Sequence, residues 1–167
     1  MKIGVLSDTH SFFHPKIIDF FKSCDEIWHC GDIGNIDILN KLKSFKPLRA
    51  VYGNIDGLEI RNECKEYEIF SVEKAKICLT HIGGYPPNYQ SESLKMIHKH
   101  KPSIFVCGHS HILRVMFDET NNLLYINPGA AGLEGFHKKI TFLRFEINDG
   151  IPSALEVYES EKRVNIK

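Results

Sequence analysis

Short apolar runs of strand length recur along the first part of this chain, and amphipathic stretches of helical length separate the first three of them. Residues 2–7, 27–30 and 48–52 are predicted strands, and residues 15–22 and 36–45 are predicted helices. Pro15 suits the first turn of a helix, where a missing amide hydrogen costs nothing. Alternation of strand, helix and strand is typical of a parallel α/β sheet.

The pattern after residue 65 looks more antiparallel. A third helix over residues 91–101 ends before Pro102 and leads into a buried strand at 103–107. Three strand pairs are predicted, each across a polar turn: 66–72 with 76–80, 113–118 with 123–126, and 139–147 with 154–159. Length is a prior of about 100–200 residues per domain, so residues 1–167 are expected to form one α/β domain with two sheets.

The residues that follow the apolar runs restrict the chemistry. In open α/β sheets, ligands bind outside the carboxyl ends of the strands. The predicted strands deliver seven oxygen or imidazole donors to such an edge: Asp8, His10, Asp32, Asn54, His81, His109 and His111. Glycines precede Asp32, Asn54 and His109, which permits tight turns and close backbone approach. In an extended backbone, the one-residue spacing of Asp8 and His10, and of His109 and His111, would project each pair to one side.

This donor set indicates a metal centre. Imidazoles with carboxylates and no thiolate suit manganese, zinc or iron better than calcium or magnesium. Seven donors are too many for one ion and suit two ions roughly 3.5–4 Å apart that share a carboxylate. Asp32 is the expected bridge, because it lies along the chain between the other donors. Each motif alone is typical of an ordinary turn or cap, so the inference depends on the whole series at strand ends.

The same motifs resemble those of the calcineurin-like metallophosphoesterases, and in particular the small bacterial and archaeal phosphodiesterases. The matching blocks run in order over residues 1–132: Asp8-Thr9-His10, Gly31-Asp32, Gly53-Asn54-Ile55-Asp56, His81 and Gly108-His109-Ser110-His111, followed by the turn Asn127-Pro128-Gly129. The resemblance implies a four-layer α/β/β/α sandwich of two mixed sheets flanked by helices. It also implies that one metal takes Asp8, His10, Asp32 and His111, and the other takes Asp32, Asn54, His81 and His109.

The expected activity is hydrolysis of a phosphoester. A hydroxide that bridges two divalent ions, held by Asp32, would attack phosphorus, with Asn54 and His109 near the phosphate. Manganese is the expected metal, with zinc, iron, nickel and cobalt as alternatives. His29, Asp56 and Asn127 are candidates for supporting residues; His29 is expected to be a hydrogen-bonded buried histidine, and Asp56 either orients a ligand or caps a turn.

Three positions depart from the family pattern. Many relatives have a histidine, implicated in phosphate contact or leaving-group protonation, where this chain has Ile55. Ile82-Gly83-Gly84 follows His81, where many relatives place a second histidine two residues on, and Ala130 stands where serine is frequent. Because loss of a general acid costs roughly 10²–10⁴-fold for poor leaving groups, Ile55 favours a phosphodiesterase over a phosphomonoesterase.

Composition bears on partners and compartment. Lys+Arg and Asp+Glu both number 21, which disfavours a nucleic acid polymer as substrate and gives no case for an anionic membrane. No apolar run suits a signal peptide or a membrane span, and the five cysteines lack paired spacing, so a soluble cytoplasmic protein with a small phosphoester substrate is expected. The apolar C-terminal strands leave a homodimer or homotetramer open. A non-catalytic binding module of the same fold is the alternative of another class.

Overall fold

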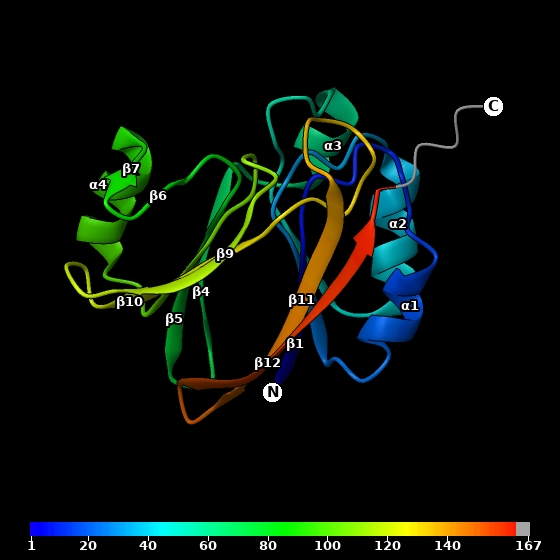
Figure 1. Ribbon diagram of the computed structural model, residues 1–167. Helices are drawn as coiled ribbons and strands as arrows, with labels where there is room; N and C mark the ends of the chain where they lie inside the picture. The colour runs from blue at the N-terminus through cyan, green and yellow to red at the C-terminus, as the bar shows by residue number, and fades with distance from the viewer. Residues whose placement is uncertain (163–167) are drawn as a thin grey trace.

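The chain folds around two stacked five-stranded sheets, as the computed structural model shows for residues 1–162 (Figure 1). The first sheet has, in spatial order, β12 (Ile151–Glu161), β11 (Lys139–Asn148), β1 (Lys2–Leu6), β2 (Glu26–His29) and β3 (Leu48–Ala50). The second has β4 (Tyr67–Val72), β5 (Ala75–Thr80), β8 (Ile104–Val106), β10 (Leu123–Pro128) and β9 (Leu113–Asp118).

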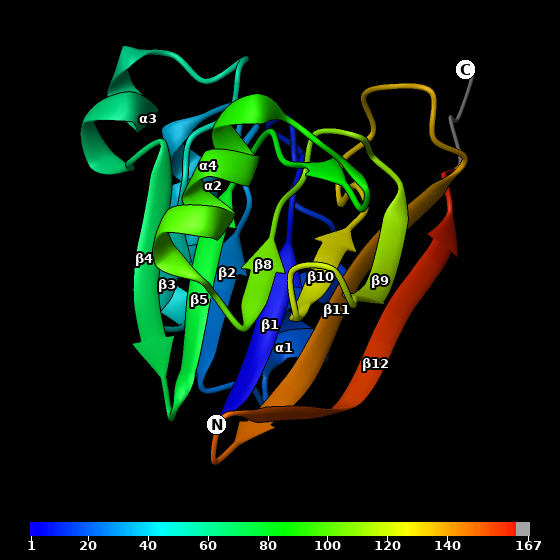
Figure 2. The same cartoon turned by 90° about the vertical axis from the view of Figure 1, so that its left-hand side faces the viewer.

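Helices cover the outer faces of both sheets. α1 (Lys16–Phe21), α2 (Ile36–Phe45) and α3 (Leu58–Glu63) lie on the side of the first sheet, and α4 (Ser91–His100) lies over the second (Figures 1 and 2). A two-stranded ribbon of β6 (Gly84–Tyr85) and β7 (Asn88–Tyr89) precedes α4. The expected four-layer α/β/β/α sandwich of two mixed sheets is therefore confirmed.

Alternation along the strands explains why the layers stack. In β1, Ile3 and Val5 belong to the core between the two sheets, whereas Leu6 packs with Ile17 and Phe21 of α1 in the core under the helices. Side chains of a strand point alternately to its two faces, so one apolar strand buries residues in two cores. A third core joins the outer face of the second sheet to α4 through Ile97. At about 25 cal/mol per Å² of apolar surface removed from water, this double burial is the main stabilising contribution to the sheets.

The parallel first half follows the expectation from sequence, and the remainder is corrected in two respects. β1, β2 and β3 are parallel, and β4–β5, β9–β10 and β11–β12 are antiparallel pairs. However, β8 runs parallel to both of its neighbours, β5 and β10, which the more antiparallel pattern after residue 65 did not indicate; the second sheet is mixed, as the expected fold class has it. The predicted element boundaries shift by one or two residues at several ends, and α3 and the β6–β7 ribbon were not predicted, because both are too short to show a periodic pattern.

The C-terminal hairpin completes the first sheet. β11 pairs antiparallel with β1, and β12 pairs with the other edge of β11, so the hairpin extends the sheet on the side of its first strand.

None of the helices in residues 1–162 combines the length and the apolar character needed to cross a membrane. All five cysteines are buried as free thiols in the apolar cores, including Cys30, Cys78 and Cys107, for which this was expected from their strand-like surroundings.

Candidate metal centre

The seven predicted donors stand in the loops at the carboxyl ends of strands from both sheets. Asp8 and His10 follow β1, Asp32 follows β2, Asn54 follows β3, His81 follows β5, and His109 and His111 follow β8. Six of them form two groups in which the ligand atoms all lie within 4.8 Å of one another: Asp8 with His10 and His111, and Asp32 with His81 and His109. Asn54 joins the second group, since its Oδ1 lies 3.0 Å from Nε2 of His81.

The first group combines a buried carboxylate oxygen that has no hydrogen-bond partner with two imidazole nitrogens. Asp8 is fully buried; its Oδ2 accepts the amide hydrogen of His109, but its Oδ1 has no hydrogen-bond partner. Nε2 of His111 lies 3.2 Å from this Oδ1, and Nε2 of His10 lies 3.4 Å from Nε2 of His111. An unpaired buried carboxylate oxygen is costly without a compensating charge, so a cation fits this group.

The second group has the same character. Nδ1 of His81 donates to the carbonyl of Cys30 at 2.7 Å, which turns its Nε2 toward Asp32 Oδ1 at 3.3 Å and Asn54 Oδ1 at 3.0 Å. With one ring hydrogen used on the carbonyl, a neutral His81 presents a lone pair to two oxygens. Either a second proton or a cation must lie among these three atoms.

The charges in the second group favour the proton when no cation is present. Burial alone would lower the pKa of His81, but its hydrogen bond to Asp32 and the charges of Asp8 and Asp32 outweigh burial and raise the pKa. Burial opposes ionisation of Asp32, yet His81 and the amide of Ile55 hold the pKa of that carboxyl below its ordinary value. Burial and the neighbouring His81 lower the pKa of His109. A cation entering here would displace the His81 proton, as metal binding to imidazole requires.

Asp32 lies between the two groups, with one oxygen toward each. Its Oδ2 is 3.7 Å from Nε2 of His10, and its Oδ1 is 3.3 Å from Nε2 of His81. The amide of Ile55 donates to Oδ1 at 3.1 Å and holds the carboxylate in this orientation.

The backbone around the donors is not extended, which corrects one expectation. Asp8, His10, Asp32, His109 and His111 all have positive φ, between 45° and 66°. His109 and His111 consequently contribute to different groups rather than projecting to one side. Left-handed backbone in residues other than glycine is uncommon and clusters at functional sites, although Asp and His tolerate it better than most residues.

Two glycines are required by close approach. A side chain at Gly53 would collide with the carboxylate of Asp32, as expected for a glycine before a donor. Gly83 is packed against Cys107, whose Sγ would lie 2.6 Å from a Cβ at that position. The second histidine of many relatives therefore has no room at position 83 of this chain.

The three supporting candidates lie around the donors and are all buried. Asp56 accepts backbone hydrogens from Ile33, Gly34 and Gly53, and so ties the loops after β2 and β3 together. His29 hydrogen-bonds Thr9 at 3.0 Å, and burial lowers its pKa to about 4, which keeps the ring neutral. The Asn127 side chain bonds Gly108 and Gly129 and shapes the loop that carries His109.

His137 belongs to the surroundings of this centre and was not predicted. Its Nδ1 lies 3.1 Å from Nδ1 of His111, and its Nε2 lies 3.1 Å from the carbonyl of Gly132. It stands in an irregular loop beyond all the strand-end motifs, so no spacing rule selected it. The only signal in the sequence is an unassigned histidine after the last donor.

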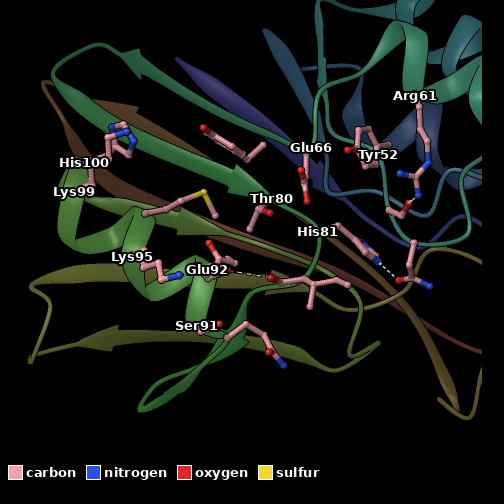
Figure 3. A pocket seen from close by; sticks show the side chains of 17 residues that line it. Tyr52, Arg61, Glu66, Thr80, His81, Ser91, Glu92, Lys95, Lys99 and His100 are labelled. Atoms are coloured by element: carbon pink, nitrogen blue, oxygen red, sulfur yellow. Dashed lines mark hydrogen bonds and ion pairs between the residues drawn. The ribbon is translucent and has the colours of Figure 1, made fainter.

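A pocket of about 610 Å³ opens beside the second group (Figure 3). Asn54 and His81 line it at one end, and it continues along α4 as far as Lys99 and His100. No side chain of the first group lines this pocket, so it extends from one side of the centre only.

Known proteins match the chain in sequence and in fold. Residues 1–150 match the model of the calcineurin-like phosphoesterase superfamily domain. A probable metallophosphoesterase of Methanocaldococcus jannaschii is 33% identical over 136 residues, 78% of this chain and 68% of that protein. A phosphodiesterase of the same organism is 26% identical over 145 residues, covering 77% of this chain and 83% of its own. The crystal structure of Entamoeba histolytica Vps29 with Zn²⁺ has a TM-score of 0.73 at 18% identity, covers 98% of this chain and 100% of its own, and is thus similar in fold.

The unpaired oxygen of Asp8 leads to a prediction about stability. In Asp8→Asn, the amide can still accept from His109 and can donate to the lone pair on His111, and the buried charge is gone. We expect this variant without metal to be more stable than the wild type by roughly 1–3 kcal/mol in urea unfolding with EDTA. We also expect it to lose most of the rise in melting temperature that Mn²⁺ causes in the wild type.

Asp19→Asn, on the exposed surface of α1, is the control: it should change the metal-free stability by no more than about 0.5 kcal/mol and should keep the wild-type rise in melting temperature with Mn²⁺. A metal-free Asp8→Asn protein that is less stable than the wild type would show that the carboxylate is compensated without a cation.

Proposed function

The chain belongs to the calcineurin-like phosphoesterase superfamily, and we propose that it is a phosphodiesterase that works with two divalent cations, most simply Mn²⁺. The observation that carries the proposal is the pair of donor groups, in which carboxylate and imidazole atoms lie close together and a buried oxygen of Asp8 has no hydrogen-bond partner. The family supports phosphoester hydrolysis, and one of the relatives is named a phosphodiesterase.

Each cation would have its own set of donors. Asp8, His10 and His111 would hold one, and Asn54, His81 and His109 would hold the other. Asp32 would be shared, which agrees with the way its two oxygens face the two groups at 3.7 and 3.3 Å from the nearest imidazole nitrogens. Imidazole and carboxylate donors without a thiolate suit Mn²⁺, and they also allow Zn²⁺, Fe²⁺, Ni²⁺ and Co²⁺.

Two cations held by these residues, with Asp32 between them, would supply a lower pKa for a nearby water and would neutralise charge on the phosphoryl oxygens. The residues of the chain would orient the substrate toward that water. Asn54 and His109 are the exposed members of the donor set, so they are the ones that a phosphate entering from solvent would meet. His109 is held in place through its own amide, which donates to Asp8 at 3.1 Å.

Ile55 decides which esters suit this site. Its amide holds Asp32, while its side chain is 47% exposed and has no proton to give to a departing alkoxide. A leaving group that is stable as an anion needs no such proton. The chain is therefore equipped for diesters with activated leaving groups and poorly equipped for alkyl monoesters.

Loss of a donor should remove the activity. We expect Asn54→Ala and His81→Ala to lower kcat/KM for bis(p-nitrophenyl) phosphate with Mn²⁺ on the order of 100-fold or more, since each variant takes away a cation ligand. Isothermal titration should find two Mn²⁺ per wild-type chain and fewer in the variants. Asn88→Ala and His98→Ala, which change exposed residues away from the centre, are the matched controls and should behave as the wild type.

Activity that survives Asn54→Ala and His81→Ala would come from another site or a contaminant. If Mn²⁺ neither binds nor supports hydrolysis in the wild type, the chain is instead a non-catalytic binding module of this fold.

Restoring a proton donor should broaden the substrate range. We expect Ile55→His to raise kcat/KM for an alkyl monoester by roughly tenfold or more relative to the p-nitrophenyl diester, because an imidazole there can protonate the departing alkoxide, whereas p-nitrophenolate leaves without a proton. The rise should fade at high pH as that imidazole loses its proton. Ile18→His, at a similarly exposed isoleucine on α1 (39% against 47%), should leave the ratio of monoester to diester activity unchanged. An unchanged ratio in Ile55→His as well would mean that position 55 does not select between the esters.

A further inference from the structure

We propose that the pocket along α4 binds a planar aromatic or heterocyclic ester group of the phosphodiester substrate. This inference rests on the proposed function, because the phosphate would lie at the donor groups while the ester group fills the pocket. We call the pocket the α4 groove; it is bounded by the end of β5, the start of β4 and one side of α4.

The α4 groove begins at the centre itself. Asn54 and His81, both donors of the second group, form part of its wall. A phosphate at these residues would carry any ester group on that side directly into the groove, as the position of His81 in Figure 3 shows. Its volume of about 610 Å³ is of the size that binds small organic molecules, whereas a methyl ester would leave most of it empty.

Apolar surface in the groove suits a flat ring. Tyr67 and Ile82 are 42% and 40% exposed, and Met96 of α4 lines the same space. Tyr67 pairs with Thr80 in the antiparallel ladder of β4 and β5, and Thr80 directly precedes His81. Directly paired residues share a face of the sheet, so Tyr67 lies on the same face as Thr80, and both line the groove together with His81. Stacking on an aromatic side chain is insensitive to the identity of the ring.

Polar groups frame this apolar surface. The Arg61 guanidinium lies over the Tyr52 ring at 4.3 Å and donates to the carbonyls of Asp56 and Gly53, which leaves further N–H groups free. Within residues 1–162 no carboxylate forms an ion pair with Arg61, although Glu66 also lines the groove, so a positive charge lies at the end of the groove that holds Tyr52 and His81 (Figure 3). This cation favours an anionic diester and disfavours a cationic ester group.

The inference can be tested with diesters that share one leaving group. Methyl, phenyl and thymidine-5′ p-nitrophenyl phosphates all release p-nitrophenolate and differ only in the group expected in the groove. With Mn²⁺, kcat/KM for the phenyl and thymidine esters should exceed that for the methyl ester about tenfold or more, mainly through KM. An equal increase in kcat/KM for both esters would show that the groove recognises the ring alone. A larger increase for the thymidine ester would show that the groove recognises a nucleoside.

Variants of Tyr67 separate binding in the groove from intrinsic reactivity. Tyr67→Ala should reduce the preference for ring-bearing esters by about tenfold, and Tyr67→Phe should keep it. Tyr85→Ala removes a tyrosine of equal exposure, 42%, that does not line the groove, and should leave the preference at the wild-type value. The proposal is overturned if Tyr67→Ala retains the wild-type ratio.

A binding measurement distinguishes failure of this inference from failure of the proposed function. In EDTA, the thymidine ester should bind the wild type several-fold more tightly than it binds Tyr67→Ala. If no diester is hydrolysed with any metal but this difference in affinity persists, ring binding in the groove is supported and the proposed activity is contradicted. If diesters are hydrolysed but the difference in affinity is absent, the proposed activity is supported and ring binding in the groove is contradicted.

A separate observation, the position of His137, points to a residue that sets the tautomer of His111. We infer that the carbonyl of Gly132 accepts the Nε2 hydrogen of His137, which makes Nδ1 of His137 an acceptor for the Nδ1 hydrogen of His111. The His111 hydrogen is then directed away from the centre, and its Nε2 presents a lone pair 3.2 Å from Asp8 Oδ1. The carbonyl of Gly132 is fixed because the amide of the same residue donates to the carbonyl of Asp8 at 3.0 Å.

His137 is thus a positioning residue that acts through His111. Such partners of metal-binding histidines typically change metal affinity about 10- to 100-fold when they are lost. We expect His137→Ala to weaken one of two Mn²⁺ sites by that factor in isothermal titration and to leave the other unchanged. His137→Gln, whose amide oxygen can accept from His111, should recover most of the affinity, and His98→Ala should behave as the wild type.

Nitrogen-15 NMR of the metal-free protein supplies a readout that a purely structural effect would not change. At a pH where the ring is neutral, His111 should be the Nδ1–H tautomer in the wild type and a mixture of tautomers in His137→Ala. Wild-type affinity at both Mn²⁺ sites in His137→Ala, or an unchanged tautomer of His111 in that variant, would overturn the inference.

Discussion

Carboxylate and imidazole side chains gather in two groups where the carboxyl ends of the two sheets meet, and the local structure of the chain is arranged around them. Asp8 Oδ1 is buried without a partner, and Nε2 of His81 faces two oxygens. Hydrogen bonds elsewhere on the same side chains hold these atoms in place: the amide of His109 on Asp8, the carbonyl of Cys30 on His81 and the amide of Ile55 on Asp32. A set of acceptors held apart from donors is costly in an empty protein and favourable around a cation.

The two-sheet stack is what brings these acceptors together. Four of the donors follow β1, β2 and β3, and the other three follow β5 and β8. The core between the sheets, with Val5, Trp28, Leu79 and Val106, sets how the strand ends of one sheet face those of the other. Close-packed interiors resist deformation, so the separation of the two donor groups depends on side chains that never touch a ligand.

The surroundings of the centre differ on its two sides. On the side of the first group, the loop after β10 is tied to Asp8 through Gly132 and reaches His111 through His137. On the side of the second group, the chain leaves an open groove with exposed aromatic surface and with the Arg61 guanidinium, which lies over the Tyr52 ring. The proposed chemistry would use both donor groups. Selection among substrates would instead depend on Ile55 and Tyr67, whose side chains lie on the groove side and would not bind a cation.

Sequence alone was sufficient for the strands of the two five-stranded sheets and for the two-sheet α/β class, because apolar patterns of strand length are local signals. The seven donors remain a prediction from the convergence of strand ends in α/β sheets, and the structure brings their side chains into two groups. The sequence was insufficient for the position of β8 between parallel neighbours, for the pairing of β11 with β1, and for the left-handed backbone that sends His109 and His111 into different groups. The sequence also did not predict the role of His137 or the α4 groove. These features depend on contacts between residues far apart in the chain, such as His111 with His137, and only packing of the complete fold decides which distant residues meet.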